Sequence, residues 1–180
     1  MSVKKRPSGR GSAQARVEAD GSAETAAERR SAEAQLNSLI ETFAPAHLRL
    51  ITAMRRLLRK RLPTAHEVVY EYAKQGAVVI SYSPNEHGYE GVLAIRADSD
   101  GVKLYFNQGK GLQDPEKLLQ GSANARWIHM ESASTLARPA VALLIDEAMA
   151  RNRVPFARTG RGPAVIRSVS DQQRRRRRHA

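Results

Sequence analysis

The feature that most constrains the fold is a series of short β-like runs between residues 66 and 107, separated by turn residues. The four runs cover about residues 66–72, 77–82, 91–97 and 102–107, and a fifth follows at about 126–131. Short, closely spaced runs of this kind favour neighbouring antiparallel strands joined by tight turns. The middle of the chain is therefore predicted to form a meander of about five strands.

Helical patterns flank this meander on both sides. A helix is predicted from Pro45 to about Lys60, with its leucines on one side and its basic residues on the other, and Pro63 ends it. A shorter helix is expected over about 36–43, another over 116–119 that ends at Gly121, and a last one up to about Arg151. These elements predict an α+β two-layer sandwich, in which an antiparallel sheet carries the N- and C-terminal helices on one face.

Composition divides the chain into three parts. Residues 1–33 are rich in small and charged residues and are predicted to be disordered, and residues 34–153 are predicted to form the folded domain. Residues 154–180 are predicted to be a disordered arginine-rich tail. The formal net charge is +12, and residues 154–180 hold eight basic residues and one acidic residue, or +7 of it.

Composition also excludes several classes of function. The chain has no cysteine, so its own thiols cannot form disulfides, attack a substrate or bind zinc and iron–sulfur clusters. No apolar run reaches about 18 residues, so we expect no membrane span and a cytoplasmic protein. The spacing of the nucleophilic and basic residues does not indicate a catalytic pair. The Gly109-Lys110-Gly111 turn lacks the flanking glycine and the Lys-Ser/Thr step of a phosphate-binding loop. We therefore expect a protein that is not an enzyme.

Three stretches carry a family resemblance: Arg61-Leu62-Pro63 before Glu67-Val68-Val69, then Val102-Lys103-Leu104-Tyr105-Phe106, and finally Asp114-Pro115 and Leu118-Leu119-Gln120-Gly121 before Arg126-Trp127-Ile128. On these residues, the part of the chain from about 34 to 153 resembles the YdhG-like domain family, whose best-described member is an intracellular frataxin-type iron chaperone. The resemblance implies a frataxin-like sandwich. It also implies a small non-enzymatic binding domain that takes part in iron handling.

Two groups of residues are candidate iron ligands, since hard metal ions bind carboxylates and Fe(II) also accepts imidazole. They are Glu67 and Glu71 on the first strand, and Glu86, His87 and Glu90 in the following loop. The alternative is a solvated strand and a polar hairpin tip. Frataxins are thought to present an acidic ridge on the first helix, whereas the long helix of this chain carries five basic residues and no acid from Arg49 to Lys60.

Basic residues indicate a second class of function. The exposed side of the long helix and the arginine run of the tail are predicted to contact nucleic-acid phosphates or an acidic protein. These residues are Arg49, Arg56, Lys60, Arg174, Arg175, Arg176, Arg177 and Arg178. If the domain holds a small ligand or anion, the turn near the fifth strand is the expected place, with Asn107, Lys110, Arg126 and Trp127.

The two classes of function predict different surfaces. Iron binding predicts that acidic residues gather once Glu67, Glu71 and Glu131 are placed on the sheet. Nucleic-acid binding predicts a continuous positive surface that joins the long helix to the C-terminal segment.

Overall fold

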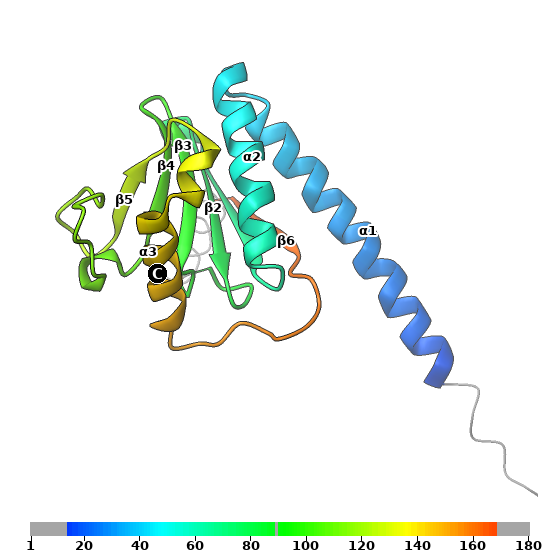
Figure 1. The fold of residues 1–180 in the computed structure, drawn as a ribbon. Coiled ribbons are helices and arrows are strands. Elements are labelled where there is room, and N and C mark those ends of the chain that lie inside the picture. Colours follow the sequence, from blue (N-terminus) through cyan, green and yellow to red (C-terminus); the bar gives the residue numbers. More distant parts are fainter. Residues whose placement is uncertain (1–13, 89, 169–180) are drawn as a thin grey trace, which may run out of the picture.

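A computed structural model describes the backbone of residues 14–88 and 90–168 and shows one sheet with its helices over one face (Figure 1). The helices are α1 (Gln14–Ile40), α2 (Pro45–Arg61) and α3 (Pro139–Ala150), with the short 3-10 helices η1 (Ala73–Gln75), η2 (Gly109–Gly111) and η3 (Ala133–Ala137). The strands are β1 (His66–Tyr72), β2 (Ala77–Ser83), β3 (Leu93–Asp98), β4 (Gly101–Phe106), β5 (Arg126–His129) and β6 (Ala164–Ser168).

The sheet differs from the predicted one in the number and the direction of its strands. Its order is β5-β4-β3-β2-β1-β6, so it has six strands where about five were predicted. The first five strands are antiparallel neighbours, as the meander pattern indicated. The sixth lies parallel to β1, so the sheet is mixed, and the prediction of an antiparallel sheet is wrong.

The added strand comes from the stretch that was predicted to be a disordered tail. Ala164 aligns with Glu67 and Ser168 with Glu71 along the β1 edge. The backbone N–H of Glu67 donates to the carbonyl of Pro163 at 2.9 Å, which fixes the start of the pairing. Residues 164–168 are therefore part of the fold, while residues 169–180 lie outside the described residues.

The first helix is also longer than predicted. The helix expected over 36–43 is the C-terminal end of α1, which begins at Gln14 and so includes residues that were predicted to be disordered. Its C-terminal part enters the core through Leu36 and Ile40, and its N-terminal half extends away from the sheet (Figure 1). Residues 1–13 lie outside the described residues.

The core lies between the sheet and the helices. Aliphatic residues from one stripe of each helix pack on the inward side of β2, β3 and β4. The helical members with the least exposure are Leu36, Ile40, Ile51, Met54, Leu58, Val141, Leu144 and Ile145. The pattern of one apolar face on each element is the reason why the helices cover the sheet on this side.

The segment before β5 turns without forming the predicted helix over 116–119. The carboxylate of Asp114 instead accepts hydrogen bonds from the backbone N–H groups of Leu118 and Leu119, at 2.9 and 2.8 Å. Gly121 then adopts a φ of +94°, and its position leaves no room for a side chain beside the Trp127 ring.

Gly121→Ala should lower the free energy of unfolding by about 2 kcal/mol or more, because a left-handed residue with a Cβ is strained and the new methyl group overpacks the site. The added Cβ would lie 2.2 Å from Cζ3 of Trp127. Gly160→Ala is the matched control, since Gly160 has a φ of +97° and no atom within 4 Å of the added Cβ. Chemical denaturation measures both variants, and equal losses would contradict a packing role for Gly121.

Two truncated chains test whether β6 belongs to the fold. A chain that ends at Ser168 keeps β6, and a chain that ends at Pro163 removes its pairing with β1. We expect the shorter chain to melt at a clearly lower temperature, because β1 then becomes an unprotected edge strand and Val69 loses its neighbour Ile166. Equal melting temperatures in circular dichroism would show that β6 adds nothing to stability.

Candidate functional site

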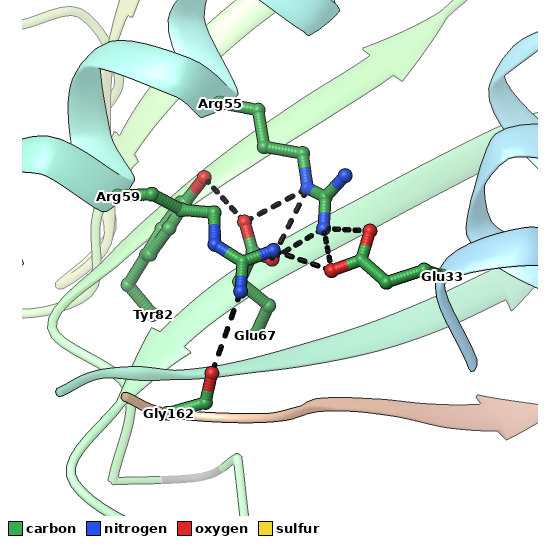
Figure 2. A network of polar contacts seen from close by, with 6 residues as sticks. All are labelled: Glu33, Arg55, Arg59, Glu67, Tyr82 and Gly162. Atoms are coloured by element: carbon green, nitrogen blue, oxygen red, sulfur yellow. Dashed lines mark hydrogen bonds and ion pairs between the residues drawn. The ribbon is translucent and has the colours of Figure 1, made fainter. Parts of the chain in front are cut away.

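The centre of the site is the carboxylate of Glu67 on β1. Glu67 pairs with Tyr82 of β2 in the sheet, and the Glu67 side chain points to the helix layer (Figure 2). Only 1% of the Glu67 side chain is exposed. A charge at this depth is strongly destabilising unless cationic partners and hydrogen bonds surround it.

Two arginines of α2 provide this compensation. Arg55 lies against Glu67 with three contacts, in which Nε donates at 2.9 and 3.1 Å and Nη2 at 2.6 Å. Nη1 of Arg59 approaches Glu67 to 2.9 Å. The hydroxyl of Tyr82 adds a hydrogen bond at 3.2 Å. Because residues 55 and 59 are four apart, both guanidinium groups reach the same carboxylate from one side of the helix.

A second carboxylate, that of Glu33 on α1, closes the cluster from outside. Nη2 of Arg55 donates to both Glu33 oxygens at 2.8 and 2.7 Å, and Nη1 of Arg59 donates to Oε1 at 2.5 Å. Glu33 is 35% exposed, whereas Arg55 and Arg59 are 12% and 19% exposed. Figure 2 shows the result, with two guanidinium groups between an inner and an outer carboxylate.

The charges of the cluster change the proton affinities of its members. Burial alone would raise the pKa of Glu33, but hydrogen bonds and charges from Arg55 and Arg59 outweigh burial and lower this pKa. Burial acts to lower the pKa of Arg55, and the two carboxylates reverse the effect and raise it. Burial and the charge of Glu67 both raise the pKa of Tyr82. These shifts favour the ionised form of Glu33, the charged form of Arg55 and the neutral phenol of Tyr82.

The outer side of the cluster opens into a groove of about 1040 Å³ between α1, α2 and the segment before β6. Seven of its lining residues are cationic and one is anionic. The cations are Arg29, Arg30, Arg55, Arg56, Arg59, Lys60 and Arg161, and the anion is Glu33. We call this hollow the cationic groove.

The segment before β6 forms one wall of the cationic groove because of close backbone contacts. Gly162 donates its N–H to the carbonyl of Pro63 at 3.0 Å, and its carbonyl lies 3.5 Å from Nη2 of Arg59. A Cβ at this position would lie 2.0 Å from the carbonyl oxygen of Ala65. The close approach thus requires glycine, and it brings the neighbouring Arg161 to the groove.

The predicted iron ligands do not come together. Glu67 is occupied by arginines, and Glu71 lies farther along β1, so the first pair offers no open site. In the loop after β2, Glu86 and His87 are exposed, and Glu90 accepts a hydrogen bond from the side chain of Asn85. Among the described residues, no group of three histidine or carboxylate side chains is placed to hold a metal ion.

The predicted small-ligand residues lie on neighbouring elements, since Phe106 pairs with Arg126 and the N–H of Lys110 donates to the carbonyl of Asn124. The side-chain amide of Asn107 donates to the carbonyl of Gly91 at 2.5 Å. Trp127 stacks on Tyr105 with ring centroids 5.5 Å apart, and Arg126, its neighbour in β5, points to the opposite face of the sheet. Lys110 is exposed. These side chains thus differ in their contacts and directions, and a ligand or anion site at this turn stays a prediction.

The predicted basic residues of α2 lie on the surface. Arg49, Arg56 and Lys60 are exposed, and the latter two line the cationic groove. Arg49 and Arg56 line a smaller hollow of about 280 Å³ beside it. The arginine run Arg174–Arg178 lies outside the described residues.

Sequence reasoning missed most members of the site, which are Glu33, Arg55, Arg59 and Tyr82 in the cluster and Arg29, Arg30 and Arg161 in the groove. Arg55 and Arg59 were counted only among the five basic residues of the long helix, and Glu33 fell in the segment that was predicted to be disordered. A usable signal was the charge of Glu67 directly before the apolar pair Val68-Val69, in a strand that follows a helix with two arginines four residues apart. Such a charge requires a partner of opposite sign when it is buried.

No family model, no curated protein and no solved structure matches this chain. The resemblance to the YdhG-like family stays a prediction. None of the helices in the described part of the chain combines the length and the apolar character needed to cross a membrane.

Glu67→Gln should lower the free energy of unfolding by about 3–5 kcal/mol, because it leaves two buried guanidinium groups with one partly exposed carboxylate. The matched control is Asp146→Asn, which removes a single ion pair with Arg61 where the aspartate is 68% exposed. An exposed pair contributes about 1 kcal/mol or less. Urea denaturation measures both, and a loss for Glu67→Gln no larger than that of the control would contradict the compensating role of the arginines.

Proposed function

We propose that this chain is a non-enzymatic binding domain whose cationic groove holds the phosphate backbone of a nucleic acid. The observation that carries the proposal is the charge of the groove, where seven cations and one partly exposed carboxylate form the lining. A concave surface lined by one sign of charge concentrates the opposite charge and speeds its association. A polyanion is the ligand that such a lining fits.

The distribution of ion pairs supports this assignment. Arg55 and Arg59 are neutralised by Glu33 and Glu67. The other five cations of the groove have no ion-pair partner within the described part of the chain, and they are Arg29, Arg30, Arg56, Lys60 and Arg161. Five unpaired positive charges around one hollow repel one another, and an anionic ligand that binds there reduces this repulsion.

Six of the seven groove cations are arginines, whose planar forks bind phosphate or carboxylate oxygens in pairs. A nucleic acid is preferred to an acidic protein because Arg161 extends the cationic lining from α2 to the C-terminal segment, which supports contact with an extended phosphate backbone. That segment continues into Arg174–Arg178, which add five charges to the same chain.

Iron handling, the role that the YdhG-like resemblance implies, draws less support from the geometry. Its predicted ligand Glu67 is bound by two arginines, and the described residues hold no cluster of three potential ligands. The groove carries charge of the sign that repels metal cations. A cytoplasmic location stays an expectation from the sequence.

A triple variant, Arg56→Ala with Lys60→Ala and Arg161→Ala, tests the proposal in the full chain. We expect the Kd for a fluorescent 20-nucleotide single strand, and for its duplex, to rise roughly tenfold to hundredfold near physiological salt. The slope of log K against log salt should fall by about 2, since each lost phosphate contact contributes about 0.7–0.9. Fluorescence anisotropy at three salt concentrations measures both quantities.

The matched control, Lys74→Ala with Lys110→Ala and Arg153→Ala, removes three exposed cations that do not line the groove. It should bind nearly as the wild type does. Equal losses in the two triple variants would show that net charge alone drives binding and would overturn the proposal. Tighter, groove-dependent binding of a polyglutamate peptide would assign the groove to an acidic protein instead.

A further inference from the structure

Within the cationic groove, the pair Arg55 and Arg59 differs from the other cations because its charge is already neutralised. The inner carboxylate, Glu67, is buried and balances one of the two positive charges. The outer carboxylate, Glu33, balances the other and is the only anion that lines the groove among the described residues. Without Glu33, two converging guanidinium groups would carry an excess of one positive charge at the floor of the groove.

We propose that Arg55 and Arg59 form a subsite for one phosphate group of the ligand, and that the Glu33 carboxylate occupies this subsite until the ligand binds. The inference rests on the proposed function and adds the position of one phosphate and the group that it displaces. A carboxylate and a phosphate offer the same kind of acceptor to an arginine fork, so one can replace the other without a change in the donors.

The geometry of Glu33 fits a displaceable occupant. Both of its oxygens are bound from one side, by Nη2 of Arg55 and by Nη1 of Arg59. Its side chain is 35% exposed toward the groove, while the Glu67 side chain behind the arginines is 1% exposed. A ligand that enters along the groove therefore meets Glu33 first and cannot reach Glu67 (Figure 2).

Displacement of Glu33 does not require α1 to leave the domain. The helix is held at its C-terminal part by Leu36 and Ile40, which are buried in the core. A glutamate side chain has three rotatable bonds, and a change of rotamer moves its carboxylate out of the subsite while the backbone stays in place. The arginines remain in position because Glu67 still binds both of them.

This arrangement makes Glu33 a competitor of the ligand. Each molecule of ligand must replace the ion pairs of Glu33, so the affinity of the groove is lower than its cations alone would give. If the Glu33 carboxylate served only to dock α1, its removal would loosen the α1 wall of the groove and lower the affinity for the ligand. The two roles of Glu33 thus predict changes of affinity in opposite directions.

The test compares Glu33→Gln with the wild-type full chain in binding the same fluorescent 20-nucleotide single strand. We expect the variant to bind roughly three- to tenfold more tightly, since a like charge beside the phosphates is removed. Glu28→Gln is the matched control, because Glu28 lies exposed on the same helix and does not line the groove. It should change the Kd by less than about twofold. An unchanged or weaker affinity of Glu33→Gln, with α1 docked as in the wild type, would overturn the proposal.

The docking of α1 is followed through the NMR signals of the Leu36 and Ile40 methyl groups. If these signals move in Glu33→Gln, a measurement on the wild type decides instead. The pKa of the Glu33 carboxyl group, now lowered by its arginines, should return toward its ordinary value when the oligonucleotide saturates the protein. A carboxyl titration that is the same with and without the oligonucleotide would overturn the subsite.

Inorganic phosphate provides a second probe of the same carboxyl group. A shift of the Glu33 titration with phosphate alone would show that the subsite binds a free phosphate, and a shift with the oligonucleotide alone would show that the rest of the groove is needed. Both results support the subsite. Failure of the proposed function is recognised separately, because the triple groove variant would then bind the oligonucleotide as its control variant does.

Discussion

The buried carboxylate of Glu67 is the constraint on which the arrangement of this domain depends. A negative charge in the core is tolerated only with cations at hydrogen-bonding distance, and both cations come from α2. Their outer sides then bind Glu33, which fixes the direction of α1. The carbonyl of Gly162 lies beside Arg59, so the segment that leads into β6 also contacts this cluster. One carboxylate thus relates four parts of the chain.

The same constraint explains why the groove is basic. The arginines that turn inward are used by the two glutamates, whereas the basic residues one step around α2 face outward without acidic neighbours. Arg56 and Lys60 are exposed, and the middle of α1 and the segment before β6 contribute further cations to the same hollow. The ion pairs of Arg55 and Arg59 thus position the elements around the groove, and the exposed cations make the groove positively charged.

Much of the fold follows from local sequence patterns. The strand predicted over residues 66–72 and the helix predicted from Pro45 agree with β1 and α2 nearly to the residue, because alternation, turn residues and an amphipathic stripe are all local signals. β6 was missed because five residues between a Gly-Pro pair and an arginine-rich stretch carry no pattern of their own. They form a strand only because the β1 edge lies beside them. The N-terminal part of α1 was missed for a related reason, since a sequence rich in alanine and charged residues offers little apolar surface for burial.

The site was harder to predict than the fold, because it joins residues that are far apart in the sequence. Glu67 was taken for a metal ligand since a carboxylate on a strand offers oxygen atoms, and nothing local shows that two arginines of α2 already bind it. Glu33 and Gly162 lie 34 residues before and 95 residues after Glu67, so only the folded chain brings them together. The exposed basic residues were found because an amphipathic helix places them on one side regardless of its partners.

The parallel pairing of β6 with β1 also determines the order in which the domain can be completed. The strands β1 to β5 pair with their neighbours in sequence, whereas β6 pairs with β1, which lies far from it in the sequence. Contacts between residues so distant in sequence form late, because a long loop must close before they add stability. During synthesis the ribosome releases this strand after all the others. The cationic groove is therefore completed only when the segment before β6 has paired with β1, and a nascent chain that lacks this segment has the sheet without one wall of the groove.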